Sequence, residues 1–269
     1  SAPPLPPAAA RARPATAEVV LRGVTFGYGP HSEPVVDQLD LRVPEGEHLV
    51  VVGPSGAGKS TLAALISGLL RPGSGEVLIG GVPADRAEHA ARVLIPQEAY
   101  VFRGTLRENL TYLAPGRDPD AAAGPTRPEG RSGDTGPGAV EAAVEALGAG
   151  ELVGVAGGYD VPLDPAALSA GQRQLVALVR AYLSPARLAV LDEATCHLDP
   201  AAEARVERAF AARGGTLVVV AHRITSARRA DRVLIIDGGR VQTGTHDRLV
   251  RADPLYADLV GHWQPEPVS

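Results

Sequence analysis

The stretch GPSGAGKST, Gly53 to Thr61, decides the fold of this chain. Its glycines let the backbone wrap a phosphate chain with N–H groups pointing inward, and a following helix would direct its positive end toward the same anion. The stretch fits the pattern G-x-x-x-x-G-K-[ST], in which the lysine contacts the β- and γ-phosphates and the next hydroxyl ligates Mg²⁺. The sequence therefore predicts a nucleotide-binding loop, whose contact residues are Gly53, Ser55, Gly56, Ala57, Gly58, Lys59, Ser60 and Thr61.

The residues on either side of this loop supply the context that the pattern requires. HLVVVG, His48 to Gly53, is a continuous apolar run typical of a buried parallel strand, and STLAALISGLL, Ser60 to Leu70, places apolar residues on one helical face. Lys59 is the only lysine in the chain, whereas a general charge role would accept arginine. A glycine-rich turn that matches by accident is the alternative, and the flanking strand and helix disfavour it. The motif alone does not choose between kinases, GTPases and transport ATPases.

Further strands and helices alternate along the rest of the chain. Strands are expected at residues 18–26, 40–46, 75–81, 92–97, 187–193 and 216–222, with a hairpin at 232–244 that turns at Gly238-Gly239. Helices are expected at 139–148, 171–183 and about 201–212, and again after the hairpin. This alternation predicts an α/β fold with a mainly parallel sheet covered on both faces.

Composition excludes several classes of partner and site. The chain has 269 residues, 45% of them hydrophobic, and a net charge of −5, so neither nucleic acid nor an anionic membrane surface is expected as a partner. The single cysteine, Cys196, excludes an internal disulfide and favours a reducing compartment, and with His197 alone it cannot complete a zinc shell. No apolar run approaches the roughly 20 residues that span a bilayer. The absence of methionine and the start at Ser1 predict an excised or processed piece of a longer chain.

LSAGQ, Leu168 to Gln172, resembles the signature motif of the ATP-binding cassette (ABC) family, with Ala170 where glycine is more usual. The resemblance implies that Ser169, Gly171 and Gln172 grip the γ-phosphate of ATP bound to the opposite subunit, from the N-terminus of a helix. An ordinary helix capped by Ser169 is the alternative interpretation.

Two carboxylates follow the apolar strand LAVL twenty residues downstream. In the ABC family the first, here Asp192, supports the Mg²⁺ shell, and the second, here Glu193, polarises the attacking water. Phosphoryl transfer needs this kind of charge neutralisation and positioned nucleophile. A solvated Asp-Glu pair at a strand end is the alternative. ATCHLD, Ala194 to Asp199, resembles the family's D-loop, with Cys196 and His197 in place of the usual Ser and Ala, and the resemblance assigns Asp199 to the nucleotide site.

Three more positions match the family in order and spacing. His222 in VVVAHR matches the switch histidine that senses the γ-phosphate, and Gln97 in IPQ matches the glutamine that meets Mg²⁺ and water. Tyr28 in FGY matches the aromatic residue that stacks on adenine, although a surface tyrosine in a turn is the alternative. The implied catalytic residues are Glu193, His222, Gln97 and Lys59, and the implied Mg²⁺ ligands are Ser60, Gln97 and Asp192.

The resemblance covers about Glu18 to His262 and implies the remaining architecture. We expect a P-loop NTPase core, an antiparallel β subdomain near the N-terminus and a helical subdomain that carries the signature motif. The expected boundaries are a linker at 1–17, the ATPase domain at 18–262 and a tail at 263–269. Within the domain, the helical subdomain takes up about 98–184 and contains a mobile loop at 114–138, which is longer than the family norm.

AYVFRGTLRENL, Ala99 to Leu110, and DGGRVQTGTHDRLV, Asp237 to Val250, resemble exporters whose membrane and ATPase parts share one polypeptide. GYDVPLDPAALSAGQ, Gly158 to Gln172, departs from them because it lacks an acidic-glycine stretch before the signature. The resemblance implies ATP and Mg²⁺ as cofactors, a second nucleotide-binding domain as partner in a homo- or heterodimer, and a transmembrane domain in the parent polypeptide. It places the chain at the cytoplasmic face of the cell membrane. The alternatives are the ATPase of an ABC importer, a soluble ABC ATPase acting on DNA or ribosomes, and a regulatory module without turnover.

Overall fold

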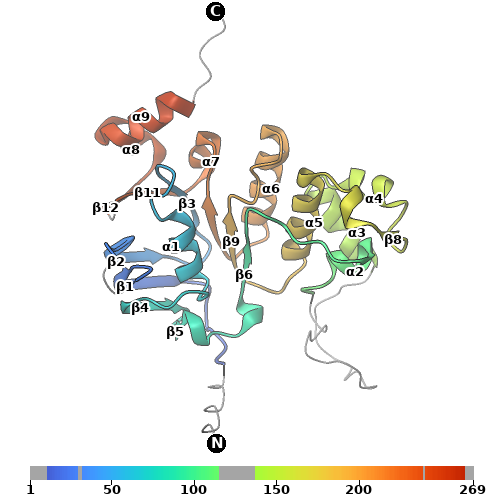
Figure 1. Cartoon of the computed structure of the whole chain (residues 1–269), viewed down its shortest axis with the longest axis horizontal. Coiled ribbons are helices and arrows are strands. Elements are labelled where there is room, and N and C mark those ends of the chain that lie inside the picture. Colours follow the sequence, from blue (N-terminus) through green and yellow to red (C-terminus); the bar gives the residue numbers. More distant parts are fainter. Residues whose placement is uncertain (1–10, 30–31, 115–136, 239, 264–269) are drawn as a thin grey trace, which may run out of the picture.

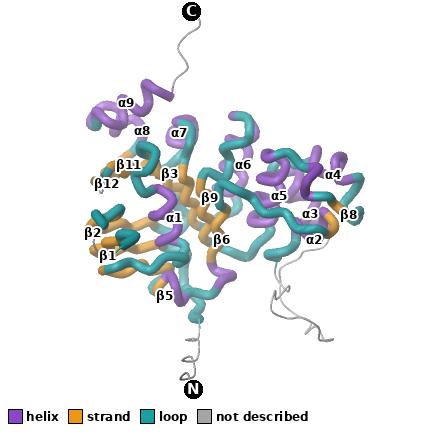
Figure 2. Tube along the Cα trace, viewed as in Figure 1, coloured by secondary structure: helices purple, strands orange, loops and turns teal. Residues whose placement is uncertain are grey.

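The computed structural model of the chain describes residues 11–29, 32–114, 137–238 and 240–263. Its described part holds a six-stranded sheet, a four-stranded sheet, a two-stranded ribbon and the helices around them (Figures 1 and 2). This mixed architecture, with mostly parallel strands in the larger sheet, confirms the predicted α/β class.

The six-stranded sheet has the order β12-β11-β3-β10-β9-β6. Its strands are β3 (His48–Val52), β6 (Arg92–Ile95), β9 (Leu188–Asp192), β10 (Thr216–Val220), β11 (Arg232–Asp237) and β12 (Arg240–Gly244). All neighbours are parallel except β12, which forms the predicted hairpin with β11; Gly239 of its turn lies outside the described residues. Val220 pairs with Val51 on one side and with Asp192 on the other, so β3, β9 and β10 end at one edge of the sheet.

The four-stranded sheet is antiparallel and lies toward the N-terminus, as the resemblance implied. Its order is β2-β1-β4-β5, with β1 at Val19–Phe26, β2 at Val36–Val43, β4 at Ser74–Ile79 and β5 at Val82–Pro83. Buried and exposed residues alternate along much of β2, because one face of this sheet is solvated. Strand β3 is instead buried at every position, which matches its unbroken apolar sequence.

Helices α2 to α5 gather beyond the β6 edge of the six-stranded sheet and form the helical subdomain that carries the signature motif (Figure 1). They are α2 (Leu106–Leu110), α3 (Pro137–Ala146), α4 (Gly150–Ala156) and α5 (Ala170–Tyr182). The ribbon of β7 (Gly104–Thr105) and β8 (Pro162–Leu163) joins this group. The remaining helices are α1 (Lys59–Ile66), α6 (Pro200–Ala212), α7 (Ile224–Arg229), α8 (His246–Ala252) and α9 (Pro254–Trp263), with 3-10 turns at Ala84–Arg86, His89–Ala91 and Pro165–Ala167.

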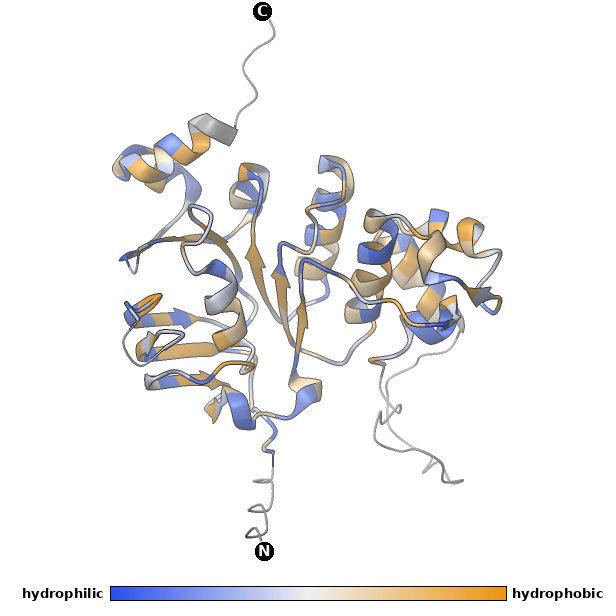
Figure 3. Cartoon of the chain, in the orientation of Figure 1, coloured by the Kyte–Doolittle hydropathy of each residue, from blue (hydrophilic) through white to orange (hydrophobic). Residues whose placement is uncertain are grey.

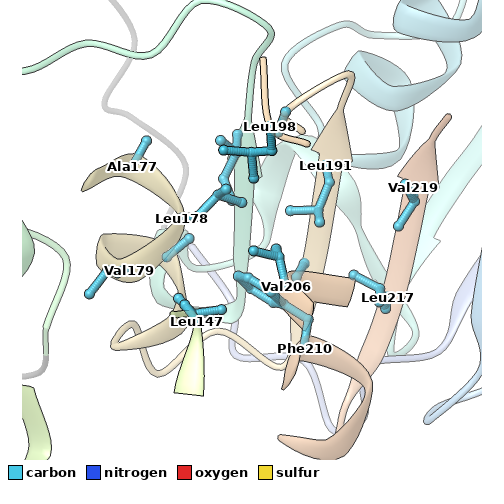
Figure 4. Close-up of a cluster of buried hydrophobic side chains, with 14 of the residues drawn as sticks. Leu147, Ala177, Leu178, Val179, Leu191, Leu198, Val206, Phe210, Leu217 and Val219 are labelled. Carbon is cyan, nitrogen blue, oxygen red and sulfur yellow. The ribbon is translucent and has the colours of Figure 1, made fainter. Parts of the chain in front are cut away.

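Two hydrophobic clusters lie on opposite faces of the six-stranded sheet, whose central strands are strongly apolar (Figure 3). Leu49 and Val51 of β3 face the cluster that holds α1 and the antiparallel sheet. Val50 and Val52 face the other cluster, which holds the helical subdomain and α6. Figure 4 shows how Phe210 of α6 packs in this second cluster. The sheet is thus covered on both faces, and this leaves its strand ends to carry polar residues.

The described part of the expected linker lies against the domain. Ala12 donates its N–H to the carbonyl oxygen of Arg86 and accepts from the N–H of Glu88, and Ala17 is buried. Ala114, the first residue of the expected loop at 114–138, is also buried, and α3 already begins at Pro137. Residues 1–10, most of that loop at 115–136, and the tail residues 264–269 lie outside the described residues. The domain boundaries stay a prediction.

Candidate functional site

The glycine-rich loop begins directly after β3 and ends in α1. Gly53 and Gly58 have φ angles of +155° and +98°, in the region that favours glycine. A Cβ at Gly53 would collide with the carbonyl oxygen of Ile236, and a Cβ at Gly58 would collide with the side chain of Val35. Both glycines are therefore required by the path of the loop.

The N-terminus of α1 has no side-chain cap, because Gly58 occupies the capping position. Helices α2, α5 and α6 are each capped by a side-chain oxygen, from Thr105, Ser169 and Asp199. The first N–H groups of an uncapped helix need another acceptor, and the helix dipole favours a negative charge there. The loop and the open end of α1 together fit a phosphate group.

Lys59 folds back over the loop. Its Nζ donates to the carbonyl oxygens of Gly53 at 3.0 Å and Pro54 at 2.9 Å. Burial lowers the pKa of Lys59, and the nearby carboxylates of Glu193 and Asp192 oppose this shift. Since an ammonium has three N–H donors, these two bonds leave one for a phosphate oxygen.

Two of the predicted Mg²⁺ ligands are in contact although they lie far apart in the sequence. Ser60 Oγ donates to Asp192 Oδ1 at 2.9 Å. Burial is the main cause that raises the pKa of Asp192; the bond from Ser60 and the charge of Lys59 lower it, and Glu193 raises it further. Carboxylate and hydroxyl oxygens are the hard ligands that Mg²⁺ takes in nucleotide sites. The residues present therefore fit this ion.

The third predicted ligand, Gln97, follows β6 and is exposed. Its backbone carbonyl accepts a hydrogen bond from Gln174 Nε2 at 2.9 Å. Within the described residues, its side chain makes no hydrogen bond to Ser60 or Asp192. The structure thus places the Gln97 backbone firmly but does not bring its side chain to the other two ligands.

Glu193 has an unusual backbone for a residue with a side chain. Its φ angle is +51°, and its N–H donates to the carbonyl oxygen of Val220 at 3.2 Å. Such a conformation costs about 1–3 kcal/mol and persists where the surroundings impose it, often at functional sites. It changes the direction of the backbone directly after Asp192, and the charges of both carboxylates act on Lys59.

His222 follows β10 by two residues and is exposed. Because β10 ends level with β3 and β9, His222 lies at the edge of the sheet from which the loop and Asp192 also emerge. Ligands of open α/β sheets bind at this carboxyl edge. The predicted switch histidine is therefore on the same edge as the nucleotide loop.

Tyr28 lies just beyond β1 and is 70% exposed. Its hydroxyl is 2.9 Å from Thr61 Oγ1, on the first turn of α1, and its ring meets Phe26 edge-on with 5.1 Å between centroids. An exposed aromatic ring tied to the nucleotide loop suits the predicted stacking on a base.

The predicted signature residues form the start of α5. Ser169 Oγ accepts from the N–H of Gln172, and Gln172 Oε1 accepts from the N–H of Ser169, which is a reciprocal capping box. The alternative of a capped helix therefore describes the local structure, but it does not exclude a second role for this exposed helix end. Helix α1 lies over β9 and β10, whereas α5 packs at the β6 edge with α2 and α3, so the signature motif and the nucleotide loop occupy different parts of the fold (Figure 1).

Asp199 caps α6 by accepting from the N–H groups of Ala201 and Ala202, at 2.8 and 2.9 Å. These bonds are the main cause that lowers the pKa of Asp199. Oδ1 of Asp199 is therefore already used to cap α6, and a contact with nucleotide would have to form while this cap is kept.

One buried residue at the site was not singled out in the sequence. Gln174 of α5 is 1% exposed, and its side chain contacts the backbone at Gln97 and the D-loop at Cys196 and His197. The only signal for it was a polar residue on the buried face of an amphipathic helix.

A buried cluster of charges behind His222 was also missed. Glu203 and Glu207 of α6 pair with Arg223 and Arg229 around the hydroxyl of Ser226. Arg223, next to His222, also donates to the carbonyl oxygen of Leu198 in the D-loop. Two glutamates four residues apart on one helix could have indicated such a cluster, but solvated positions are far commoner.

The hydroxyl of Ser226 lies between the two carboxyl groups of this cluster. Its Oγ lies 2.7 Å from Glu203 Oε1 and 2.6 Å from Glu207 Oε1, and its single proton can be donated to only one of them. The other contact then needs a proton on a carboxyl group. Burial raises the pKa of Glu207, and the hydrogen bond from Ser226 and the charge of Arg229 oppose this shift.

Comparison with known proteins gives a consistent result. The model of the ABC transporter family matches residues 36–196. The ABC transporter ATP-binding protein RamB of Streptomyces coelicolor is 57% identical over 249 residues, and the match covers 91% of this chain and 38% of the relative. The mycobactin import ATP-binding/permease protein IrtB of Mycolicibacterium smegmatis is 42% identical over 85% of this chain and 38% of its own length. The ATP-dependent lipid A-core flippase of Burkholderia orbicola is 35% identical over 91% of this chain and 40% of its own length.

A solved structure shows the same similarity to ABC transporters at the level of the fold. A bacterial Atm1-family ABC exporter with ATP bound superposes with a TM-score of 0.81 and 29% identity, over 98% of this chain and 44% of that one. The chain therefore spans less than half of the proteins it matches. Within the described residues, no helix is both long enough and apolar enough to cross a membrane.

Proposed function

Because this chain belongs to the ABC transporter family, we propose that it is the ATP-binding and ATP-hydrolysing domain of an exporter-type transporter, in which two such domains close around two Mg-ATP molecules. The observation that carries the proposal is the contact between Ser60 and Asp192 beside the uncapped start of α1. It combines an anion site with two oxygen ligands for a divalent cation, and Mg-ATP needs both.

Binding of ATP depends on the loop and on Tyr28. The backbone N–H groups from Gly53 to Thr61 receive the phosphates, and Lys59 donates its remaining N–H to a phosphate oxygen. Tyr28, whose ring is exposed while its hydroxyl contacts Thr61, offers that ring to the base. These groups bind substrate without reacting with it.

Ser60, Asp192 and the side chain of Gln97 would hold Mg²⁺. When bound, this ion neutralises charge that develops on the phosphate oxygens. Burial raises the pKa of Asp192, so its charge is most stable when a cation lies beside it. The hydroxyl of Ser60 already faces that carboxylate and needs no rearrangement to share the ion.

Hydrolysis depends on Glu193 and His222. The carboxylate of Glu193 orients a water molecule for attack on the γ-phosphate, from a backbone held at a positive φ angle. His222, at the same edge of the sheet, contacts the γ-phosphate. Catalysis of this type relies on position and charge rather than on a covalent intermediate.

The second domain completes the site. Ser169 is exposed, and Gly171 and Gln172 are half-buried, at the start of α5, in a different part of the fold from the nucleotide loop of the same chain. An exposed helix N-terminus is suited to the γ-phosphate of ATP on a second copy or a related domain. Asp199 lies near this interface and caps α6 there.

The membrane partner and the direction of transport rest on the relatives. Two of them are named as ATP-binding/permease and flippase proteins, and each is more than twice as long as the part matched here, so we infer a transmembrane domain in the parent polypeptide and a position at the cytoplasmic face of the membrane. Export is favoured by the flippase and by the Atm1-family exporter. Import is the second candidate, because one relative is named for mycobactin import.

The test is ATP hydrolysis by the purified chain with Mg²⁺, compared with Glu193→Gln. We expect turnover by the wild type and a loss of at least a hundredfold in the variant, with ATP binding retained. Equal turnover by both proteins would exclude Glu193 as the residue that orients water. Absence of ATP binding by the wild type would exclude the proposed function itself.

A further inference from the structure

The side chain of Gln174 is almost fully buried where α5 meets two separate loops. It projects from the second turn of α5 and is 1% exposed. Its Nε2 donates to the carbonyl oxygen of Gln97 at 2.9 Å and to Cys196 Sγ at 3.5 Å, and its Oε1 accepts from the N–H of His197 at 3.1 Å. All of its main hydrogen-bonding groups are used, so the amide has one defined orientation.

The two loops and α5 have different assignments in the proposed site. Gln97 belongs to the segment expected to meet Mg²⁺ and water in the chain's own site. Cys196 and His197 belong to the D-loop, which begins immediately after Glu193. Helix α5 itself begins at the signature residues, which serve the opposite site. One amide therefore connects parts of both ATP sites.

The packing between α5 and the D-loop is also close at the backbone. A Cβ added to Gly171 would lie 3.0 Å from the carbonyl oxygen of His197, so the first turn of α5 has little freedom to slide against this loop. Gln174 holds the other side of the same contact through the N–H of His197. The start of α5 and the D-loop are thus held together at two points.

We propose that Gln174 is a positioning residue that makes the segment at Gln97, the D-loop and the signature end of α5 move as one unit. A shift of the Gln97 backbone, which responds to the chain's own site, then displaces the signature residues that face the other site. Gln174 acts through these backbones and does not itself touch ATP. The inference rests on the proposed function, because that function gives the two loops and the start of α5 their roles.

The test compares three variants of the purified chain by steady-state ATP hydrolysis and thermal unfolding. Gln174→Met keeps the length and volume of the side chain and removes its hydrogen bonds. Cys196→Ala removes only the long sulfur contact. Thr216→Val is the matched control: it removes a buried hydroxyl that donates to the carbonyl oxygen of Ala17 at 2.7 Å, at the opposite end of β10 from His222.

For Gln174→Met we expect kcat to fall at least tenfold while KM for ATP changes less than threefold, because the nucleotide loop is on other elements. Such a split indicates loss of an interaction that matters after ATP has bound. Faster hydrogen exchange at the N–H of His197 should accompany it. Cys196→Ala should change kcat less than threefold, and Thr216→Val should lower Tm with kcat unchanged.

Several results would overturn the proposal. One is a kcat for Gln174→Met within twofold of the wild-type value. Another is a tenfold fall in kcat for Thr216→Val, because it would show that any buried defect lowers kcat. If Gln174→Met does not fold, Gln174→Asn, whose shorter amide cannot reach Gln97, carries the same expectation. If the wild type is active, Glu193→Gln is inactive and Gln174→Met is as active as the wild type, this inference alone is refuted. If the wild type itself is inactive, the inference and the proposed function are refuted together.

Discussion

Replacement of Glu203 by glutamine tests whether the charge cluster behind His222 holds that part of the fold together. The Glu203 side chain is 3% exposed and is bonded to Arg223 at 2.5 Å and to Ser226 at 2.7 Å, with Arg229 at 3.4 Å. Glutamine keeps the shape of this side chain, so the change removes the charge without leaving a cavity. The two arginines would then share one remaining buried carboxyl group, that of Glu207.

The expected loss in the free energy of unfolding depends on the burial of Glu203 and on the partial exposure of its two arginine partners. Removing one partner of a buried ion pair costs about 3–5 kcal/mol. The side chains of Arg223 and Arg229 are 32% and 22% exposed and can regain part of their hydration, which lowers the expected cost to about 2–3 kcal/mol. Glu76→Gln is the control, because Glu76 and its partner Arg22 are 50% and 65% exposed and such a pair contributes less than about 1 kcal/mol.

Urea unfolding at pH 7 measures both variants, with the m-value checked for equality before the free energies of unfolding are compared. A loss below about 0.5 kcal/mol for Glu203→Gln would show that the buried charge of Glu203 does not stabilise the fold. Equal losses for Glu203→Gln and Glu76→Gln would refute the argument from burial.

Two further predictions concern single side chains. Tyr28→Phe should change the Kd for ATP less than threefold and Tyr28→Ala should weaken it about tenfold, since a base stacked on a ring gains about 1–3 kcal/mol; nucleotide titration checks this, and equal weakening by both would exclude stacking. Because the pKa of Glu207 is raised, the native state retains a proton that the unfolded state loses above about pH 4.5. The contribution of this group to the free energy of unfolding is therefore complete below that pH and is lost as the pH rises through the native pKa. Urea unfolding between pH 5 and 8 should therefore show Glu207→Gln gaining stability relative to the wild type as the pH rises, and a constant difference would contradict the shift.

The elements that could be predicted from the sequence are those with an unbroken local signal. Strands β3 and β10 are buried at every position, as their apolar runs predicted. The loop from Gly53 was equally clear, because its glycines, lysine and hydroxyl have fixed spacing. Helices α4 and α7 were not expected, since seven and six residues are too few for a helical period to be recognised.

The site was predictable in its residue types but not in its contacts. Ser60 and Asp192 were both predicted as Mg²⁺ ligands, which implied that they lie close together. The direct hydrogen bond between these residues, 132 positions apart in the sequence, was not predicted. The junction at Gln174 could not be predicted, because it depends on how α5 packs against two loops that lie 77 and 22 residues away. The burial of Glu203 contradicts the usual exposure of glutamate, and only the tertiary structure provides its arginine partners.

The central claim is that ATP is enclosed between two domains of this kind. The most direct test uses two copies of this chain: the mass of Glu193→Gln is measured in solution by sedimentation, with and without ATP and Mg²⁺. We predict a shift from 27.7 kDa to twice that mass with ATP, and no shift when Ser169→Arg is added, although the double variant should still bind nucleotide. A protein that is saturated with ATP and remains at 27.7 kDa, or a dimer that persists with arginine at position 169, would contradict the claim.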